Sequence, residues 1–223
     1  MRLSRCPPGD PGATIAYMSE QPQMNKNPEF LARKRRRVHD PHVRPLNTLV
    51  DRWNGDRLRV PYVDPDSGGI HARILFLGES PGPRASAEHG SGLISTDNND
   101  RSAERFWRLS RQAGLSRDIY ISWNAVPWYV SGTVTNKNAT PADGEAALPY
   151  LHEFVTLLPD LRVVVVMGGF ARHWWFRYLI DCPDSRVLPV LAAPHTSSRA
   201  GISNPRFEQD IFAAMAKARQ AAL

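Results

Sequence analysis

A chain of 223 residues, of which 42% are hydrophobic and 22% are charged, suits one soluble globular domain, and no apolar run approaches the length of a membrane span. The formal net charge of +6 favours a polyanionic partner. Two cysteines, Cys6 and Cys182, are too few for a disulfide framework or for a four-cysteine iron–sulfur or zinc site.

The N-terminal part of the chain is the least regular. Residues 1–27 are rich in Pro, Gly and polar residues and have no signal-peptide core, which predicts a disordered tail; residues 28–223 are expected to form a single domain. The basic run from Arg33 to Arg37 fits a solvated helix face and a contact with phosphates equally well. Helical spacing of apolar residues between Val43 and Trp53 predicts a helix, and residues 59–69 form a connection.

The next segment predicts the centre of the fold. An apolar run from Ile74 to Leu77 stops at Gly78 and is followed by a turn of small and rigid residues over 79–83. The run is short and lacks a 3.6-residue period, so it predicts a buried parallel strand that ends in a tight loop. Ligands of open α/β sheets bind beyond the carboxyl ends of strands. Catalytic or ligand-binding residues are therefore expected in this loop.

Helices and strands alternate through the rest of the chain. A long polar loop over 85–100 precedes a predicted helix from Ser102 to Ala113, which Gly114 ends. Further strands are predicted at 118–122, 163–167 and 187–191, and further helices at 140–158, from 169 through Tyr178, and around Phe207 to Met215. Four strands alternating with helices predict a central four-stranded parallel sheet between two helical layers, a three-layer α/β/α sandwich.

Three of the predicted strands deliver polar residues at or just beyond their carboxyl ends. These residues are Glu79, Asn124 and His195. Because the carboxyl ends of parallel strands share one edge of a sheet, we expect one cleft to collect all three.

The loop at 78–82 admits more than one hypothesis. It fits the G-x-S-x-G pattern of a nucleophile elbow, which would make the protein a serine hydrolase using Ser80 and His195. Against this, the oxyanion hole needs the N–H of the residue after the serine, and Pro81 has none. An ordinary strand-to-helix turn also favours Pro and Gly. A third hypothesis is a non-catalytic protein that binds single-stranded or abasic DNA through its basic arm and aromatic residues.

Three separated motifs, taken in order, resemble those of the uracil-DNA glycosylase superfamily. GESPG at Gly78–Gly82 is similar to its first motif, above all the GEAPG of its family 4. AGLSRDIYISWNAVPW at Ala113–Trp128 is similar to the segment that carries its base-reading asparagine, and PHTSS at Pro194–Ser198 resembles its last motif, HPS. The order and spacing agree from about Ile74 to Ala216. The chain departs from family 4 in lacking the cysteines of its iron–sulfur cluster.

The resemblance implies both a fold and an activity. The fold is the same three-layer sandwich, and the activity is that of a monofunctional DNA glycosylase of base excision repair. The enzyme would hydrolyse the N-glycosidic bond of uracil, and of related deaminated or damaged bases, in single- or double-stranded DNA. Hydrolysis uses water alone, so no cofactor and no metal is expected. The resemblance further implies a monomer that works on DNA in the cytoplasm, with no membrane partner.

The resemblance also implies roles at the scissile bond. His195 is expected to donate a hydrogen bond to the developing oxyanion at uracil O2. Glu79 is expected to orient or deprotonate the attacking water, or to shield the sugar cation. Asn124 presents a flat amide that is complementary to the N3–H and O4 edge of uracil.

The remaining expected contacts surround the base and its phosphates. Gly78 and Ser80 are expected to bind the base, and an alternative role for Glu79 is to hold it, together with Ser80, through backbone N–H groups. Leu93 falls near the position where the family stacks an aromatic ring; Trp123 and Trp128 are alternatives to Leu93. The base must be flipped out of the stack before it can be cleaved. The expected phosphate contacts are Pro81, Gly82, Pro83, Arg84, Ser197 and Arg199.

Overall fold

A four-stranded parallel sheet lies at the centre of the computed structural model, which describes residues 21–56, 58–130, 138–197 and 206–223. Its strands run in the spatial order β4-β2-β5-β6. Their bounds are β2 (Ile74–Gly78), β4 (Tyr120–Asn124), β5 (Val163–Met167) and β6 (Val190–Ala193). Each neighbouring pair is parallel. The predicted four-stranded parallel sheet is therefore confirmed.

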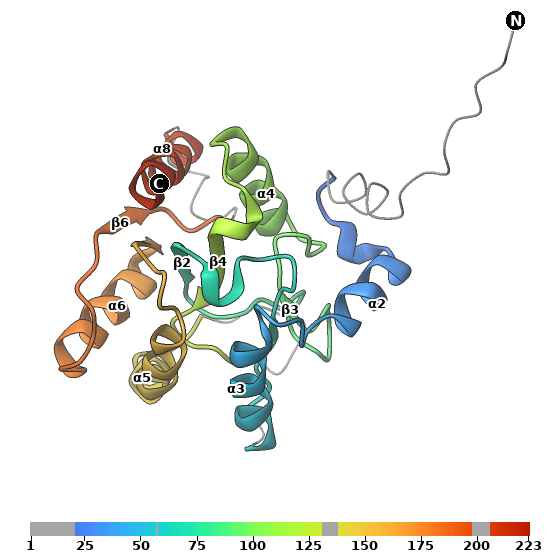
Figure 1. Cartoon of the computed structure of the whole chain (residues 1–223), viewed down its shortest axis with the longest axis horizontal. Coiled ribbons are helices and arrows are strands. Elements are labelled where there is room, and N and C mark those ends of the chain that lie inside the picture. Colours follow the sequence, from blue (N-terminus) through green and yellow to red (C-terminus); the bar gives the residue numbers. More distant parts are fainter. Residues whose placement is uncertain (1–20, 57, 131–137, 198–205) are drawn as a thin grey trace, which may run out of the picture.

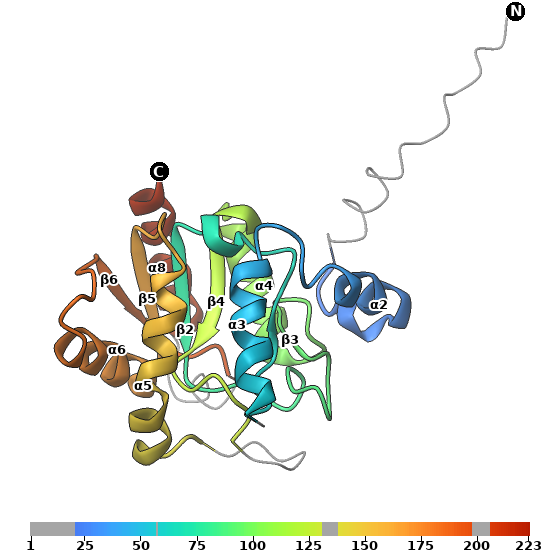
Figure 2. The ribbon, with the colours of Figure 1, turned by 60° about the horizontal axis from the view of Figure 1, so that its bottom comes forward.

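Helices cover both faces of this sheet (Figures 1 and 2). Leu75 and Leu77 face the layer formed by α3 (Arg44–Gly55), α5 (Pro141–Thr156) and α6 (Gly169–Asp181), whereas Ile74 and Phe76 face α4 (Arg101–Gln112) and α8 (Phe207–Ala222). Alternate residues of a strand point to opposite faces, so a strand buried on both faces is apolar throughout. This arrangement is the predicted α/β/α sandwich. No helix in the described part of the chain is long and apolar enough to cross a membrane.

Two of the predicted strands have different bounds in the structure. Residues 117–119 form a short 3-10 helix, η3 (Arg117–Ile119), so the strand predicted at 118–122 begins at Tyr120. The strand predicted at 187–191 instead spans 190–193, and Val187 is 86% exposed. Pro189 directly precedes β6, and because a proline has no N–H with which to join a ladder, Val187 and Leu188 are left outside the strand.

A second, small sheet ties two loops together. β1 (Tyr62–Val63) pairs in parallel with β3 (Leu93–Ile94), so the connection at 59–69 and the loop at 85–100 lie side by side. The structure has two further 3-10 helices, η1 (Met24–Lys26) and η2 (Gly69–His71). Strands of two residues carry no periodicity, which is why the sequence did not predict them.

The described residues include the end of the predicted tail. Residues 1–20, with Cys6, lie outside the described residues. Asn25, however, is buried; its backbone N–H donates to the Asp97 carbonyl at 2.9 Å, and its amide donates to Asn98 Oδ1 at 2.9 Å. The prediction of disorder over residues 1–27 is therefore wrong for residues 21–27, because polar side chains there find buried polar partners 73 residues away.

The basic run lies on α2 (Pro28–Arg36) and just after it, and Lys34 is its one buried member, whereas Arg35 and Arg36 are exposed. Lys34 is 2% exposed, and its Nζ lies 2.7 Å from Asp64 Oδ2 and 2.6 Å from Asp97 Oδ2. Arg35 donates to the Ser91 carbonyl at 2.9 Å. Neither a solvated helix face nor a phosphate contact describes Lys34, whereas Arg35 lies on an exposed part of the helix. Both side chains fasten α2 to the loop that follows β2.

The charges around Lys34 compensate one another. Burial alone would lower the pKa of Lys34, but the carboxylates of Asp64, Asp97 and Asp66 raise it further than burial lowers it. Burial likewise acts to raise the pKa of Asp97, but two hydrogen bonds from Arg117, each of 2.6 Å, and the charge of Lys34 bring it below its usual range. The cluster is therefore ionised and paired at neutral pH.

Replacing Lys34 by methionine is expected to lower the free energy of unfolding by about 3 kcal/mol, since it leaves buried carboxylates without their cation. Urea unfolding at pH 7 measures this loss, and Arg36→Met, an exposed position on the same helix, is the matched control. A loss under about 1 kcal/mol, typical of a surface ion pair, would contradict this prediction.

The ionised Asp97 carboxylate stabilises the wild-type fold at pH values above the pKa of an aspartate in the unfolded chain. This stabilisation is lost as the pH falls through the pKa of Asp97 in the folded protein, which is lower.

Candidate active site

A pocket of about 340 Å³ lies beyond the carboxyl ends of β2 and β4. Four segments line it: the loop after β2, the loop between β3 and α4 with the first turns of α4, the end of β4, and the loop after β6. Asn124 and His195 both line this pocket, whereas Glu79 does not. The expected cleft therefore exists, with two of its three expected members.

The loop after β2 forms one wall. Its pocket-lining residues are Ser80, Pro81, Gly82, Pro83, Arg84 and Ala85. The turn is closed by a hydrogen bond of 3.0 Å from the Ala85 N–H to the Gly82 carbonyl. A Cβ on Gly90 would lie 2.1 Å from the Arg84 carbonyl oxygen, so the far end of the loop requires a glycine. Four of the six expected phosphate contacts thus share one wall of the pocket.

Asn124 ends β4 with its side chain in the pocket. In the sheet it lies opposite Gly78, where an added Cβ would lie 2.8 Å from Asn124 Oδ1. Ser122, two residues earlier on the same side of the strand, also lines the pocket, and its buried hydroxyl has no hydrogen-bond partner among the described residues. Gly78 itself does not line the pocket. Its missing side chain instead leaves room for the Asn124 amide.

Replacing Gly78 by alanine is expected to displace the Asn124 amide and to lower kcat/KM for any base that this amide binds by about tenfold, the cost of one misplaced hydrogen bond. The fold should persist, because the new methyl group meets a side-chain oxygen and not backbone. Gly55→Ala, at the end of α3 and outside the pocket, is the matched control, since nothing lies within 4 Å of its added Cβ. Equal activity of the two variants would contradict this prediction.

His195 is held in one tautomer. The Ser197 N–H donates to its Nδ1 at 3.1 Å, so Nδ1 is the acceptor and Nε2 carries the proton. Burial lowers the pKa of His195 below its ordinary value of 6.5, although the charges of Glu79 and Asp100 oppose that shift. At pH 7 the ring is therefore neutral and offers one N–H. This is the protonation state that the expected role of His195 requires.

The loop that carries His195 is fastened from α4, a contact that the sequence did not predict. Arg105 donates through Nη1 to the Thr196 carbonyl and through Nε to Glu208 of α8 at 3.0 Å. Ser197, an expected phosphate contact, lines the pocket. Arg199, another, lies outside the described residues. Arg105 is thus a positioning residue for the imidazole.

Glu79 is engaged away from the pocket. Its Oε1 accepts a hydrogen bond of 2.8 Å from the Ala139 N–H, two residues before α5. Its backbone carbonyl accepts from the Val126 N–H at 2.9 Å. Glu79 therefore joins the loop after β2 to the segments that follow β4. Its expected action on water stays a prediction, and the geometry offers another carboxylate for that task.

That carboxylate is Asp100, which the sequence analysis did not single out. It lines the pocket and caps the N-terminus of α4, where its Oδ1 accepts from the N–H groups of Ser102 and Ala103 at 2.8 and 2.9 Å. Burial raises the pKa of Asp100, while these two N–H groups and the charges of Arg84 and His195 oppose the rise. Its position, an aspartate directly before an amphipathic helix, was the signal that could have identified it as a cap.

The aromatic side of the pocket also differs from expectation. Leu93 is buried in β3 and does not line the pocket, whereas its neighbour Ile94 does, because successive residues of a strand point to opposite sides. Trp123 is stacked on a phenylalanine of α5 at a ring separation of 4.0 Å, and neither it nor Trp128 lines the pocket. The aromatic ring that does is Phe106, from α4.

The geometry does not favour a serine nucleophile. No hydrogen bond joins Ser80 to His195 among the described residues, and His195 Nδ1 is already occupied by the Ser197 N–H. Nor do the described residues contain a group of three or more His, Cys, Asp or Glu that could hold a metal ion. The pocket instead offers a neutral N–H donor, a free amide and a carboxylate.

Comparison with known proteins finds a family whose profile matches this chain and solved structures that are similar to it. The profile of the family described as "Uracil DNA glycosylase superfamily" matches residues 65–216. Among solved structures, "The crystal structure of WT Pedobacter heparinus SMUG2" is 13% identical in sequence, with a TM-score of 0.47 over 67% of this chain and 77% of that chain. No curated protein matches the chain significantly.

Proposed function

The chain belongs to the uracil DNA glycosylase superfamily, and on that basis we propose that it removes uracil from DNA by hydrolysing the N-glycosidic bond, as a monofunctional enzyme. Membership of the family supports a DNA glycosylase that acts on damaged bases; the choice of uracil and the absence of strand cleavage are the proposal. The observation that carries it is the meeting of Asn124, His195 and Asp100 around one pocket.

Base recognition is assigned to the end of β4. The Asn124 amide makes no hydrogen bond to another described residue, so its oxygen is free to accept from uracil N3–H and its nitrogen to donate to O4. Cytosine presents the reverse pattern on that edge and would leave the amide unsatisfied. The unpartnered hydroxyl of Ser122 offers a further polar contact from the same strand. Phe106 supplies the apolar surface against which a flat ring can lie.

Bond cleavage is assigned to His195 and Asp100. As the bond between C1′ and N1 breaks, its electron pair leaves with the base, and negative charge collects on O2, where the His195 Nε2–H can donate. The sugar becomes cationic, and the Asp100 carboxylate stabilises it and directs the attacking water. The water oxygen bonds to C1′, and one water proton passes to the carboxylate. The proton then passes from the carboxylate through solvent to the uracil anion, so the products are an abasic site and free uracil and Asp100 is again ionised.

DNA binding is assigned to the wall after β2 and the loop after β6. Arg84 is exposed at the rim of the pocket, and the backbone around Gly82 leaves space for a phosphate, since nothing lies within 4 Å of a Cβ added there. The net charge of +6 favours the polyanion as a whole. The flipped nucleotide would pass between these two loops. We further propose that the protein acts as a monomer on DNA in the cytoplasm.

Incubation with uracil-containing single- and double-stranded oligonucleotides tests this function. After incubation with the protein, alkali should cleave the strand at the uracil position. A strand incubated with the protein but not treated with alkali should stay intact, as expected for a monofunctional enzyme. Matched oligonucleotides with cytosine or thymine at that position should be unchanged. If neither uracil substrate yields abasic sites, the proposal fails; if strand cleavage occurs without alkali, its monofunctional part fails.

A further inference from the structure

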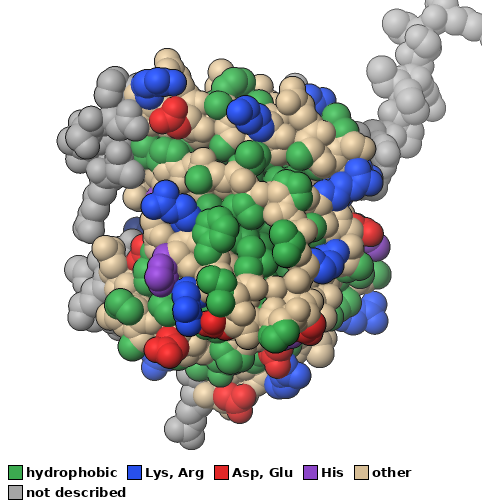
Figure 3. All heavy atoms as spheres, turned by 90° about the vertical axis from the view of Figure 1, so that its left-hand side faces the viewer, with side chains coloured by type: hydrophobic (Ala, Val, Ile, Leu, Met, Phe, Trp, Pro, Cys, Tyr) green, Lys and Arg blue, Asp and Glu red, His purple; other side chains and the backbone are tan. Residues whose placement is uncertain are grey.

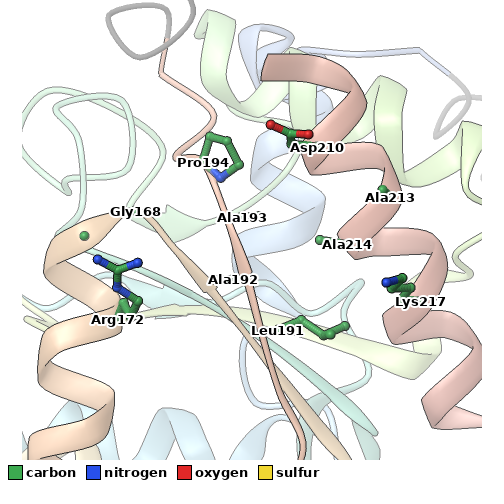
Figure 4. A pocket seen from close by; sticks show the side chains of 11 residues that line it. Gly168, Arg172, Leu191, Ala192, Ala193, Pro194, Asp210, Ala213, Ala214 and Lys217 are labelled. Atoms are coloured by element: carbon green, nitrogen blue, oxygen red, sulfur yellow. The ribbon is translucent and has the colours of Figure 1, made fainter. Parts of the chain in front are cut away.

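A second and larger pocket, of about 520 Å³, lies away from the candidate active site, along the edge strand β6 (Figure 4). α6 borders it on one side and α8 on the other. Its floor is made of small side chains, with Ala192 and Ala193 on the strand and Ala213 and Ala214 on α8. Small residues on both sides leave a trough beside the strand. None of the roles proposed above uses it.

The outer edge of β6 has no partner among the described strands. β6 ends the strand order, and only β5 pairs with it. The carbonyls of Pro189 and Ala193 accept hydrogen bonds from Val164 and Gly168, on the β5 side. Backbone groups alternate in direction along a strand, so Ala192 directs its N–H and carbonyl away from β5. Unpaired edge groups of this kind are a template for another strand.

The surface around this edge is apolar at its centre and carries charged side chains of both signs at its border (Figure 3). Figure 3 shows this face, with hydrophobic side chains gathered in the middle and several Lys and Arg side chains around them. Three of the four exposed large hydrophobic residues of the described chain lie on α6 or just before β6: Phe176, Ile180 and Val187. Arg172 and Lys217, which flank the trough, make no ion pair with a described residue. One acidic residue, Asp210, also lines it.

We propose that this edge is a docking site for an extended, acidic segment of a partner protein, which adds to β6 as a further strand. The unpaired backbone of Ala192 supplies hydrogen bonds, the apolar face receives alternate side chains, and Arg172 and Lys217 pair with carboxylates between them. A nucleic acid would use the two cations but would gain nothing from an unpaired strand edge with exposed apolar residues. The described N-terminal residues lie on the opposite side of the molecule from this edge (Figure 1).

Fluorescence anisotropy of the full chain with a labelled peptide of alternating valine and glutamate tests this site. We expect saturable binding that Ala192→Pro weakens about tenfold, because it removes an outward N–H that edge strands can spare without unfolding. The double variant Arg172→Glu/Lys217→Glu should weaken binding at least as much, and Arg219→Glu, elsewhere on α8, should not. A peptide of alternating valine and lysine should not bind. Thermal unfolding establishes that each variant is folded.

Two outcomes would overturn the proposal. One is the absence of saturable binding of the glutamate peptide to the wild type, or equal binding to Ala192→Pro. The other is that Arg172→Glu/Lys217→Glu weakens binding of a single-stranded oligonucleotide but not of the peptide, which would make the trough part of the DNA path. Neither readout depends on base excision, so the failure of this proposal is distinguishable from that of the glycosylase activity.

Discussion

Replacing His195 by alanine is expected to slow uracil excision by about 10²- to 10³-fold, the usual cost of removing one donor to a developing oxyanion. The donor is the Nε2–H, which the hydrogen bond from the Ser197 N–H to Nδ1 keeps protonated. Affinity for uracil-containing DNA should be nearly unchanged, since the lost contact forms mainly in the transition state. Single-turnover excision and anisotropy with an uncleaved oligonucleotide measure the two quantities separately.

His71→Ala is the matched control for this substitution, because His71 is an exposed histidine just before the amino end of β2, whereas the pocket lies beyond the carboxyl end of that strand. An excision rate for His195→Ala within about threefold of the wild type would exclude the imidazole from the chemical step. Loss of DNA affinity equal to the loss of rate would instead favour the non-catalytic binding hypothesis.

The pH dependence follows from the same residue. Burial places the pKa of His195 below 6.5, so the neutral ring is the dominant form at and above neutral pH. As pH falls through the lowered pKa, Nδ1 gains a proton and can no longer accept from the Ser197 N–H. The excision rate should therefore be level near pH 7 and fall on the acid side. A maximum below pH 5 would contradict the neutral donor.

Replacing Asp100 by asparagine is expected to slow excision by about 10²- to 10⁴-fold, the range for removal of a group that directs or deprotonates the reacting water. The substitution separates the action of the carboxylate on the reacting water from its role as the cap of α4. Asparagine caps a helix as well as aspartate does, so the hydrogen bonds to the Ser102 and Ala103 N–H groups can persist and the thermal midpoint should barely change. Single-turnover excision at saturating enzyme measures the effect.

Glu79→Gln is the companion variant that decides between the two carboxylates. Its amide oxygen can still accept from the Ala139 N–H, so the contact that Glu79 makes is retained. We expect this variant to excise uracil within about tenfold of the wild type. A large loss for Glu79→Gln with none for Asp100→Asn would restore the water-activating role to Glu79 and leave Asp100 as a helix cap only.

The sequence by itself determined the architecture and the order of the motifs. Apolar runs such as 74–77 and 163–167, which lack helical periodicity, suffice to identify buried parallel strands, because burial on both faces demands hydrophobic residues throughout. Parallel strands then bring their carboxyl ends to one edge, so the meeting of Asn124 and His195 followed from topology alone.

Only the tertiary structure decided which side chains face the pocket. Leu93 and Ile94 are adjacent apolar residues, and the pairing of β3 with β1 makes the second of them the pocket residue. Glu79 and Asp100 are both acidic residues in loops, and the choice between them depends on the Ala139 N–H and on the start of α4. The direction of a loop side chain depends on partners far away in the chain, and these leave no local pattern in the sequence. Lys34 shows the same limit, since its three carboxylates come from other segments.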